Sequence, residues 1–451
     1  MSLFRRIRDL APADPLMRKV LRNTGYLFSG SMASTALNAV QGILVPVALG
    51  AVGYGVFGLL MSFATSVNRL LSFRMGELVI RYAGEAISLG QKQRASAIIR
   101  FAGLVEVLTS ITAYALLVLL SPWAAETLLD NPSLAMWIRI YGLALLGNML
   151  FETGTAVLQL ANRFHVQAAI GFAQSLVTFV VVVLAYFLGW GLVPILAGYL
   201  AGKLLLGVAT AAAAWRALPD LVGPDWHGAR LGELTNRREM LGFAVSTNLS
   251  ATVNLLMRDS EVLWVGYFLS PLEAGYYKLA LTVMGLILMP IDPFIKTTYP
   301  EFGAAIAKQQ WNTLRGLLRR TSAIAAAWTF SCLAGLLLLG RPILALVKDG
   351  EYLPSYPAIL ILLIGYGIAN IFFWNRPLLL ALGLPNEPLI ITAVAGAVKT
   401  ALMFVLVRPF GYLMQAALLS AYFAVSVGLI VWRGMSESRR REAAWRPQEA
   451  V

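Results

Sequence analysis

Charged residues are scarce in this sequence. Only 13% of its 451 residues are Asp, Glu, Lys or Arg, whereas 58% are hydrophobic and the mean hydropathy is +0.71. A soluble domain carries about 25% charged residues. Water is therefore not the main solvent of this chain, and the composition predicts a protein embedded in a membrane.

Cysteine and histidine are nearly absent. The single cysteine, Cys332, excludes an intramolecular disulfide and a multi-cysteine metal site, and His165 and His227 lie far apart in the sequence. No Gly-rich phosphate loop and no nucleophile elbow occurs, so ATP hydrolysis and hydrolase chemistry lack residues to perform them. We expect neither a metal nor another cofactor, and we expect that the protein is not an enzyme.

Long apolar runs are abundant, and each is long enough for a helix of about 20 residues to cross the bilayer. We predict an all-α integral membrane protein with about twelve transmembrane helices. The predicted spans are 23–48, 53–75, 100–120, 134–160, 166–189, 192–215, 241–267, 275–300, 319–341, 356–381, 387–407 and 412–433.

Basic residues gather at one end of these spans. The first 22 residues form a basic arm, and the loops on the opposite side hold only Arg341, Lys348 and Arg408. Because Lys and Arg that flank the spans are retained in the cytoplasm, both termini are predicted to be cytoplasmic, in a bacterial inner membrane. The net charge of +13 then reflects topology and contact with anionic lipid, not nucleic-acid binding.

The two halves of the chain share a weak repeat. Gly53-Tyr54 at the start of the second span matches Gly275-Tyr276 at the start of the eighth, about half the chain later. Six spans separate the copies, which predicts two six-helix lobes related as parallel repeats. The predicted division is a cytoplasmic arm 1–22, lobes 23–215 and 241–433 joined by a cytoplasmic connector 216–240, and a cytoplasmic tail 434–451.

Neutral polar residues line one face of two predicted spans. In the first span they include Asn38 and Gln41, and in the seventh they include Asn254, which lies one helical turn before Arg258. Such residues face away from lipid. They either form hydrogen bonds between helices or line the wall of a hydrated cavity.

Three cationic side chains fall near the middle of predicted spans, namely Lys203, Arg258 and Lys399. A charge at this depth costs at least about 3 kcal/mol, so each needs a partner or water. Asp259 could make a purely structural ion pair with Arg258; the alternative is a cavity wall that meets the substrate.

Lys296 and Arg376 lie nearer the predicted cytoplasmic ends of their spans. Their side chains could reach the lipid headgroups, or they could enter the same cavity from below. A cavity lined by these five cations would be electropositive and would take an anionic ligand. Arginine binds phosphate through its planar fork, so a pyrophosphate on a lipid carrier fits this chemistry.

The whole chain resembles the polysaccharide and O-antigen flippases of the multidrug/oligosaccharidyl-lipid/polysaccharide exporter superfamily. The resemblance is carried by GYGVFGLL at 53–60, RYAGEAI at 81–87, NLLMRD at 254–259, AGYYKLA at 274–280 and YPEF at 299–302. It implies two six-helix lobes in a V around a cationic central cavity. It also implies alternating access that moves undecaprenyl-pyrophosphate-linked oligosaccharide to the periplasmic leaflet for O-antigen (lipopolysaccharide), capsule or exopolysaccharide synthesis.

The resemblance also suggests which lipid-linked substrate is moved. In the cell-wall precursor flippases of this superfamily, cavity arginines in the first and seventh helices matter. Arg258 can take the second role, but the first span has no charged residue between Gly25 and Leu49. This difference favours a polysaccharide repeat unit as the substrate.

Two other functions remain open at this stage. A drug/cation antiporter of the same superfamily would want a buried carboxylate in the first lobe, where Glu152 is expected to be the only one well inside the membrane. A membrane polysaccharide polymerase or ligase would need a sizeable outer loop, and the longest ones, 121–133 and 342–355, are short. The sugars carried, proton or sodium coupling, the oligomeric state and any polymerase partner are left open.

Overall fold

The structure is a computed structural model of the chain. It describes residues 15–73, 75–228 and 255–444, together with residues 234, 239, 240, 242, 248 and 252. Of residues 15–31 and of 256, 292, 293, 296 and 297 it describes the backbone alone. Helices run through almost all of this part of the chain, and it contains no strand. Eight of its helices are long and apolar enough to cross a membrane, which confirms the all-α membrane architecture.

Twelve spans were predicted, and the difference has identifiable causes. The first two predicted spans form one continuous helix, α2 (Pro15–Leu71), and the last two form α18 (Asn386–Ala444). The seventh predicted span falls partly outside the described residues. The eighth is divided into α12 (Pro271–Leu288) and α13 (Asp292–Ala307), because Pro290 between them has no N–H to continue the helical hydrogen bonds.

Each of the two long helices bends at a glycine. Gly50 has φ +71° and Gly411 has φ +75°, which is the left-handed region that only glycine enters at low cost. The bends fall within two residues of the junctions between the predicted spans. The backbone amide that follows Gly50 is also satisfied, since the N–H of Ala51 donates to Oε1 of Glu351 at 2.8 Å.

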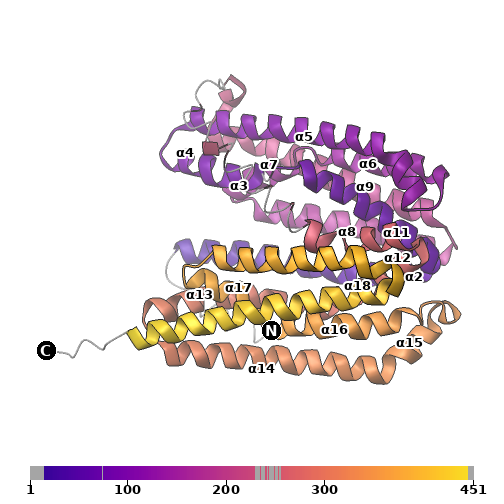
Figure 1. Cartoon of the computed structure of the whole chain (residues 1–451). Coiled ribbons are helices and arrows are strands. Elements are labelled where there is room, and N and C mark those ends of the chain that lie inside the picture. The colour runs from indigo at the N-terminus through magenta and orange to yellow at the C-terminus, as the bar shows by residue number, and fades with distance from the viewer. Residues whose placement is uncertain are drawn as a thin grey trace, which may run out of the picture. The chain divides into compact units, whose positions relative to one another are not determined.

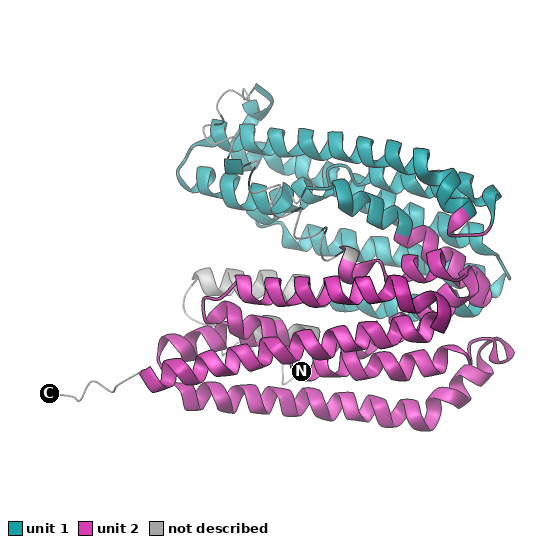
Figure 2. Ribbon diagram, viewed as in Figure 1, with its two compact units in different colours: residues 1–48, 63–126, 131–252 teal, residues 49–62, 127–130, 253–451 magenta. Residues whose placement is uncertain are grey.

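The chain folds into two compact units (Figure 2). The first consists of residues 1–48, 63–126 and 131–252, and the second of residues 49–62, 127–130 and 253–451. Besides its part of α2, the first unit contains α3 (Met75–Leu78), the π-helical turn η1 (Val79–Ala83), α4 (Gly84–Ser88), α5 (Lys92–Thr127), the 3₁₀ turn η2 (Pro132–Leu134), α6 (Ala135–Gly147), α7 (Phe151–Leu160), α8 (Phe164–Phe187), α9 (Leu192–Val222) and the 3₁₀ turn η3 (Pro224–Gly228).

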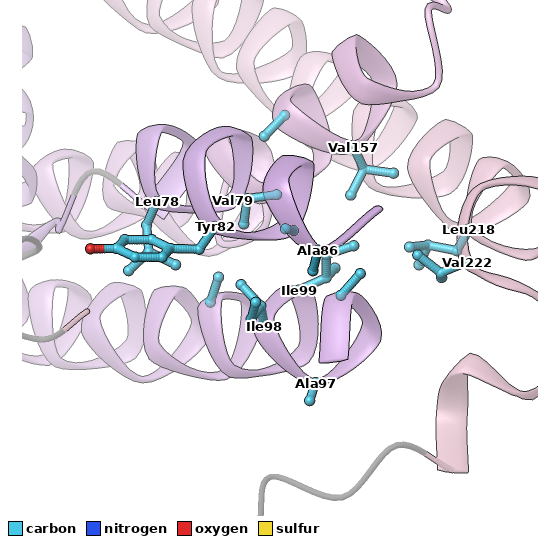
Figure 3. Packing of buried hydrophobic residues seen from close by; sticks show 14 of the residues in the cluster. Leu78, Val79, Tyr82, Ala86, Ala97, Ile98, Ile99, Val157, Leu218 and Val222 are labelled. Atoms are coloured by element: carbon cyan, nitrogen blue, oxygen red, sulfur yellow. The ribbon is translucent and has the colours of Figure 1, made fainter. Parts of the chain in front are cut away.

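In the first unit, α9 packs against α6, α7 and α8 (Figure 1). A buried apolar cluster joins the short helices after α2 to α5, α7 and α9. Figure 3 shows Leu78 and Tyr82 facing Ile98 of α5, with Val157 of α7 and Leu218 of α9 further along the cluster. This packing holds α5 and α7 together. These two helices carry the polar groups described below.

The second unit contains residues 49–62 of α2, followed by the π-helical turn η5 (Leu255–Asp259), α11 (Glu261–Phe268), α12, α13, α14 (Trp311–Gly335), the π-helical turn η6 (Leu336–Gly340), α15 (Arg341–Leu346), the 3₁₀ turn η7 (Val347–Gly350), α16 (Ser355–Ile371), α17 (Asn375–Ala381) and α18. Helix α16 lies at its centre and packs against α12, α14 and α18 (Figure 1). A second buried cluster, which includes Phe302, Trp311 and Leu378, joins α13, α14 and α17.

The two Gly-Tyr turns of the sequence repeat meet inside the second unit. A Cβ atom added to Gly55 would lie 1.7 Å from the carbonyl oxygen of Pro271, and one added to Gly275 would lie 2.0 Å from that of Ala51. The hydroxyl groups of Tyr54 and Thr282 lie 2.8 Å apart and form a hydrogen bond beside this crossing. The two helices therefore touch through their backbones, which only glycine allows.

We expect Gly275→Ala to destabilise the protein by about 1–3 kcal/mol, because its methyl group would overlap a backbone carbonyl that has no room to move. Thermal unfolding of the purified protein in detergent would measure the loss. Gly285→Ala, on the same helix with open space around it, is the matched control and should leave the melting temperature unchanged. Equal melting of the two variants would contradict the close approach.

Candidate functional site

A π-helical turn in the second unit carries Arg258 and Asp259. In η5 the N–H of Ser260 donates to the carbonyl of Leu255 at 3.0 Å, so the turn is one residue wider than an α-helical turn. The Arg258 side chain is 56% exposed, and its Nε lies 3.4 Å from Oδ1 of Asp259. The Arg258 side chain is thus only partly covered by protein, with Asp259 beside its guanidinium group.

Directly after this turn, Glu261 lies at the centre of a buried polar network. Its carboxylate accepts hydrogen bonds from Tyr277 Oη at 2.8 Å, from Gln415 Nε2 at 2.6 Å and from the ammonium group of Lys399. The side chains of Glu261 and Lys399 are each 2% exposed. A buried ion pair is tolerated only when further hydrogen bonds satisfy both charges, and this network supplies them.

Lys399 also holds the π-helical turn. Its Nζ donates a second hydrogen bond to the carbonyl oxygen of Met257 at 2.9 Å, so one side chain of α18 ties η5 to α11. The sequence predicted Lys399 at an open cavity wall, and the structure instead encloses its ammonium group. The reason is Glu261, a carboxylate that the sequence does not connect with Lys399.

Aromatic side chains of α16 and α18 pack against one another in the second unit. The ring centroid of Phe423 lies 4.6 Å from that of Tyr366 and 5.3 Å from that of Tyr422.

The first unit holds a cavity of about 210 Å³ formed by α2, α5, α6, α7 and α9. We call it the Lys203 cavity, and its polar lining includes Asn68, Ser72, Glu106, Asn148, Glu152 and Lys203. The lining brings one cation and two carboxylates together.

Glu106 anchors one wall of the Lys203 cavity. The residue is 4% exposed, and its two carboxylate oxygens accept the backbone N–H groups of Glu152 at 2.8 Å and of Thr153 at 3.0 Å. These amides belong to the first turn of α7, where N–H groups have no partner within the helix and where the helix dipole favours a negative charge.

The expectation that Glu152 is the only deeply placed carboxylate of the first lobe is therefore wrong. Glu106 bonds directly to the backbone of Glu152 and so lies at the same depth. A single carboxylate in the apolar run 100–120 was the available signal. Nothing in the sequence shows which backbone amides Glu106 meets.

Lys203 projects from α9 into this cavity and is half-buried. Its backbone carbonyl accepts a hydrogen bond from Nδ2 of Asn148 at 3.2 Å, which ties α9 to the end of α6. Within the part of the chain that the structure describes, its ammonium group forms no ion pair within 4.0 Å.

The remaining predicted site residues do not form a common site among the residues that the structure describes. Gln41 is 3% exposed and its Nε2 donates to the carbonyl of Ser175 at 3.0 Å, so it links α2 to α8, as the alternative interpretation of the polar stripe had it. Asn38 on α2 and Arg376 at the start of α17 are exposed. Lys296 lies on α13 with a side chain outside the described set, and Asn254 lies outside the described residues altogether.

The fold is shared with transporters of known structure. An inward-facing multidrug resistance MATE family transporter of the MOP superfamily is 16% identical with a TM-score of 0.71, covering 92% of this chain and 96% of that one. The lipid II flippase MurJ in an inward closed conformation is 13% identical with a TM-score of 0.70, covering 93% and 90%. The protein is thus a multi-pass membrane protein with the fold of MOP superfamily transporters.

More specifically, the chain belongs to the family of polysaccharide biosynthesis proteins, whose family model matches residues 49–357. The inner membrane protein YghQ of Escherichia coli (strain K12) is 23% identical over 352 residues, which cover 77% of this chain and 97% of YghQ. The teichuronic acid biosynthesis protein TuaB of Bacillus subtilis (strain 168) is 22% identical over 297 residues, covering 62% of this chain and 59% of TuaB.

The buried Glu261–Lys399 pair gives a test of the network around the π-helical turn. We expect Lys399→Met or Glu261→Gln alone to cost about 3–5 kcal/mol, because each leaves an uncompensated buried charge. The double variant should regain most of that stability. Thermal unfolding in detergent would measure all three.

Arg315→Met, at an exposed pair with Glu442 2.5 Å away, is the matched control and should cost at most about 1 kcal/mol. Additive losses in the Lys399/Glu261 double variant would show that the two charges do not stabilise each other.

The role of Glu106 can be tested through hydrogen exchange. Glu106→Ala should leave the amides of Glu152 and Thr153 without partners, at a cost of about 1–3 kcal/mol, and both amides should exchange faster. Glu126→Ala, at an exposed carboxylate near the end of the same helix, should change neither property. Unchanged protection of the first turn of α7 in Glu106→Ala would refute the capping role.

Proposed function

We propose that this protein is a flippase that moves an undecaprenyl-pyrophosphate-linked oligosaccharide repeat unit from the cytoplasmic to the periplasmic leaflet of a bacterial inner membrane. Its product would serve O-antigen, capsule or exopolysaccharide synthesis. Support comes from membership of a polysaccharide biosynthesis family and from a fold shared with a lipid flippase. The proposal includes two cytoplasmic termini, lobes 23–215 and 241–433 and a connector at 216–240.

The observation that carries the proposal is the exposed side chain of Arg258 on the π-helical turn η5, in the seventh span that the sequence predicts. Such a charge is costly in hydrocarbon and is retained where water or an anionic ligand meets it. Asp259 lies on only one side of the group, at 3.4 Å, and leaves donors for another partner. A pyrophosphate offers oxygens in the geometry that the guanidinium fork binds best.

The buried network explains how Arg258 is held for this task. Lys399 binds the carbonyl of Met257, directly before Arg258, and also the carboxylate of Glu261, three residues after it. The turn that bears Arg258 is therefore fixed on both sides. We assign Lys399 and Glu261 a positioning role, in which they act on the substrate through Arg258.

A drug/cation antiporter is the second candidate, and one observation favours it. Glu106 and Glu152 place two carboxylates beside the Lys203 cavity, where a proton or a sodium ion could bind. The two functions separate in a gene deletion strain. A flippase leaves lipid-linked repeat units in the cytoplasmic leaflet when it is lost, whereas an antiporter leaves the cell more sensitive to cationic drugs.

Replacement of Arg258 tests the proposal directly. We expect Arg258→Ala to lower polysaccharide export about 10- to 100-fold at an unchanged protein level, the factor expected for loss of a charged hydrogen bond. Arg258→Lys should retain part of the activity, since the charge remains without the planar fork.

Arg408→Ala serves as the control, because Arg408 is an exposed arginine of α18 in the same unit, 5.9 Å from the ring of Phe268. It should export normally. Full export by Arg258→Ala would remove this residue from the mechanism, and absence of accumulated lipid-linked repeat units in the deletion strain would refute the flippase function itself.

A further inference from the structure

The last turns of α18 lie beside the start of α14, and a shallow groove lies between the two helices of the second unit (Figure 1). The apolar side chains that line it are Trp311, Leu314, Leu318 and Met435. All four belong to, or pack against, the buried cluster that joins α13, α14 and α17. The groove is thus backed by a packed core that fixes its shape.

Arginine side chains give this groove its charge. Arg315 donates to both carboxylate oxygens of Glu442, at 2.5 and 2.9 Å, and so joins α14 to α18. Arg439 also lines the groove and is exposed, and the exposed Arg319 lies one turn beyond Arg315 on α14. Within the described residues, neither Arg319 nor Arg439 takes part in an ion pair. Three arginines therefore face one carboxylate at this end of the unit.

These arginines lie close to the depth of the lipid headgroups. The apolar run of α18 ends near the exposed Trp432, and aromatic residues of this kind are enriched at the membrane surface. Arg439 follows seven residues later, about 10 Å along the helix. On α14 the predicted apolar run begins at residue 319, one turn after Arg315. Long arginine side chains at these positions can reach the lipid phosphates.

The groove also contains a hydrogen-bond donor that the protein leaves without an acceptor. Trp311 is 5% exposed, and its indole N–H has no partner among the described residues. A buried donor without a partner is destabilising, and in proteins such a group is commonly completed by a ligand or an ordered water. The groove has a volume of about 10 Å³, which is room for one water-sized group.

Size and charge together identify the class of ligand. Pockets for soluble ligands measure about 300–1,000 Å³, and this groove is far too small to enclose one. A phospholipid need not be enclosed, because its chains already lie in the bilayer and only its phosphate oxygens need a site. Guanidinium groups bind phosphate oxygens, and basic pockets between membrane helices select anionic headgroups.

We propose that the groove between α14 and α18 binds the phosphate group of an anionic membrane phospholipid, with Arg319 and Arg439 as its cationic ligands. The Arg315–Glu442 pair has a positioning role, because it holds the two helices on either side of the groove. With the cytoplasmic termini proposed above, this lipid belongs to the cytoplasmic leaflet. The bound lipid fastens the end of α18 to α14, and this binding does not require the flippase function.

A lipid titration tests the site. Phosphatidylglycerol is added to the purified protein in a neutral detergent, native mass spectrometry counts the bound lipid, and thermal unfolding is followed in parallel. We expect phosphatidylglycerol to remain bound and to raise the melting temperature, and phosphatidylcholine to do neither. Arg319→Gln and Arg439→Gln should each weaken the apparent affinity about five-fold, the factor for one arginine near an anionic surface.

Arg216→Gln is the matched control, because Arg216 is an exposed arginine of α9 in the first unit on the side of the membrane that is predicted to be cytoplasmic. It should leave the affinity unchanged. Without added lipid, Arg319→Gln and Arg439→Gln should melt at the same temperature as the unaltered protein, since both residues are exposed. Removal of residues 445–451 should also leave the affinity unchanged, and a loss would place the binding in the tail and overturn the inference.

Two further outcomes would overturn the inference, namely equal binding of phosphatidylcholine and an unchanged affinity in both arginine variants. An equal rise of the melting temperature with inorganic phosphate would do so as well, because it would mark an anion site open to solvent instead of a lipid site. The measurement needs no transport. A protein that binds phosphatidylglycerol here but moves no lipid-linked sugar would therefore refute the flippase function alone.

Discussion

The ion pair between Lys399 and Glu261 connects three helical segments of the second unit at a point where neither charge reaches solvent. Each charge would be costly alone in an apolar interior, and each becomes tolerable because the other is present and further donors complete the carboxylate. The second Lys399 hydrogen bond goes to the backbone of η5. Burial of this pair thereby determines the shape of the turn that presents Arg258.

The two units use charge in different ways. In the second, two charges are closed off from solvent and the half-exposed Arg258 beside them remains available. In the first, both carboxylate oxygens of the buried Glu106 accept backbone N–H groups of α7.

Glycine provides the backbone geometry that lets these helices come together. Bends at Gly50 and Gly411 divide the two longest helices, and the contact of Gly55 with Pro271 brings two helices to backbone distance. Both features were visible in the sequence as glycines near predicted span ends and in a Gly-Tyr repeat. That these glycines bend two helices and allow a backbone contact between two others follows only from the dihedral angles and the contacts.

The sequence by itself determined that this is an integral membrane protein, because apolar runs of bilayer length leave few alternatives. It also identified Arg258 as a charge within a predicted transmembrane span, where a charge is energetically costly. Tertiary structure alone decided which charges are paired. Lys399 and Glu261 are 138 residues apart, and Glu106 meets α7 across 46 residues, so no local pattern could join them. Hydropathy depends on composition along the chain, whereas ion pairing depends on which helix faces meet, and that is set by packing.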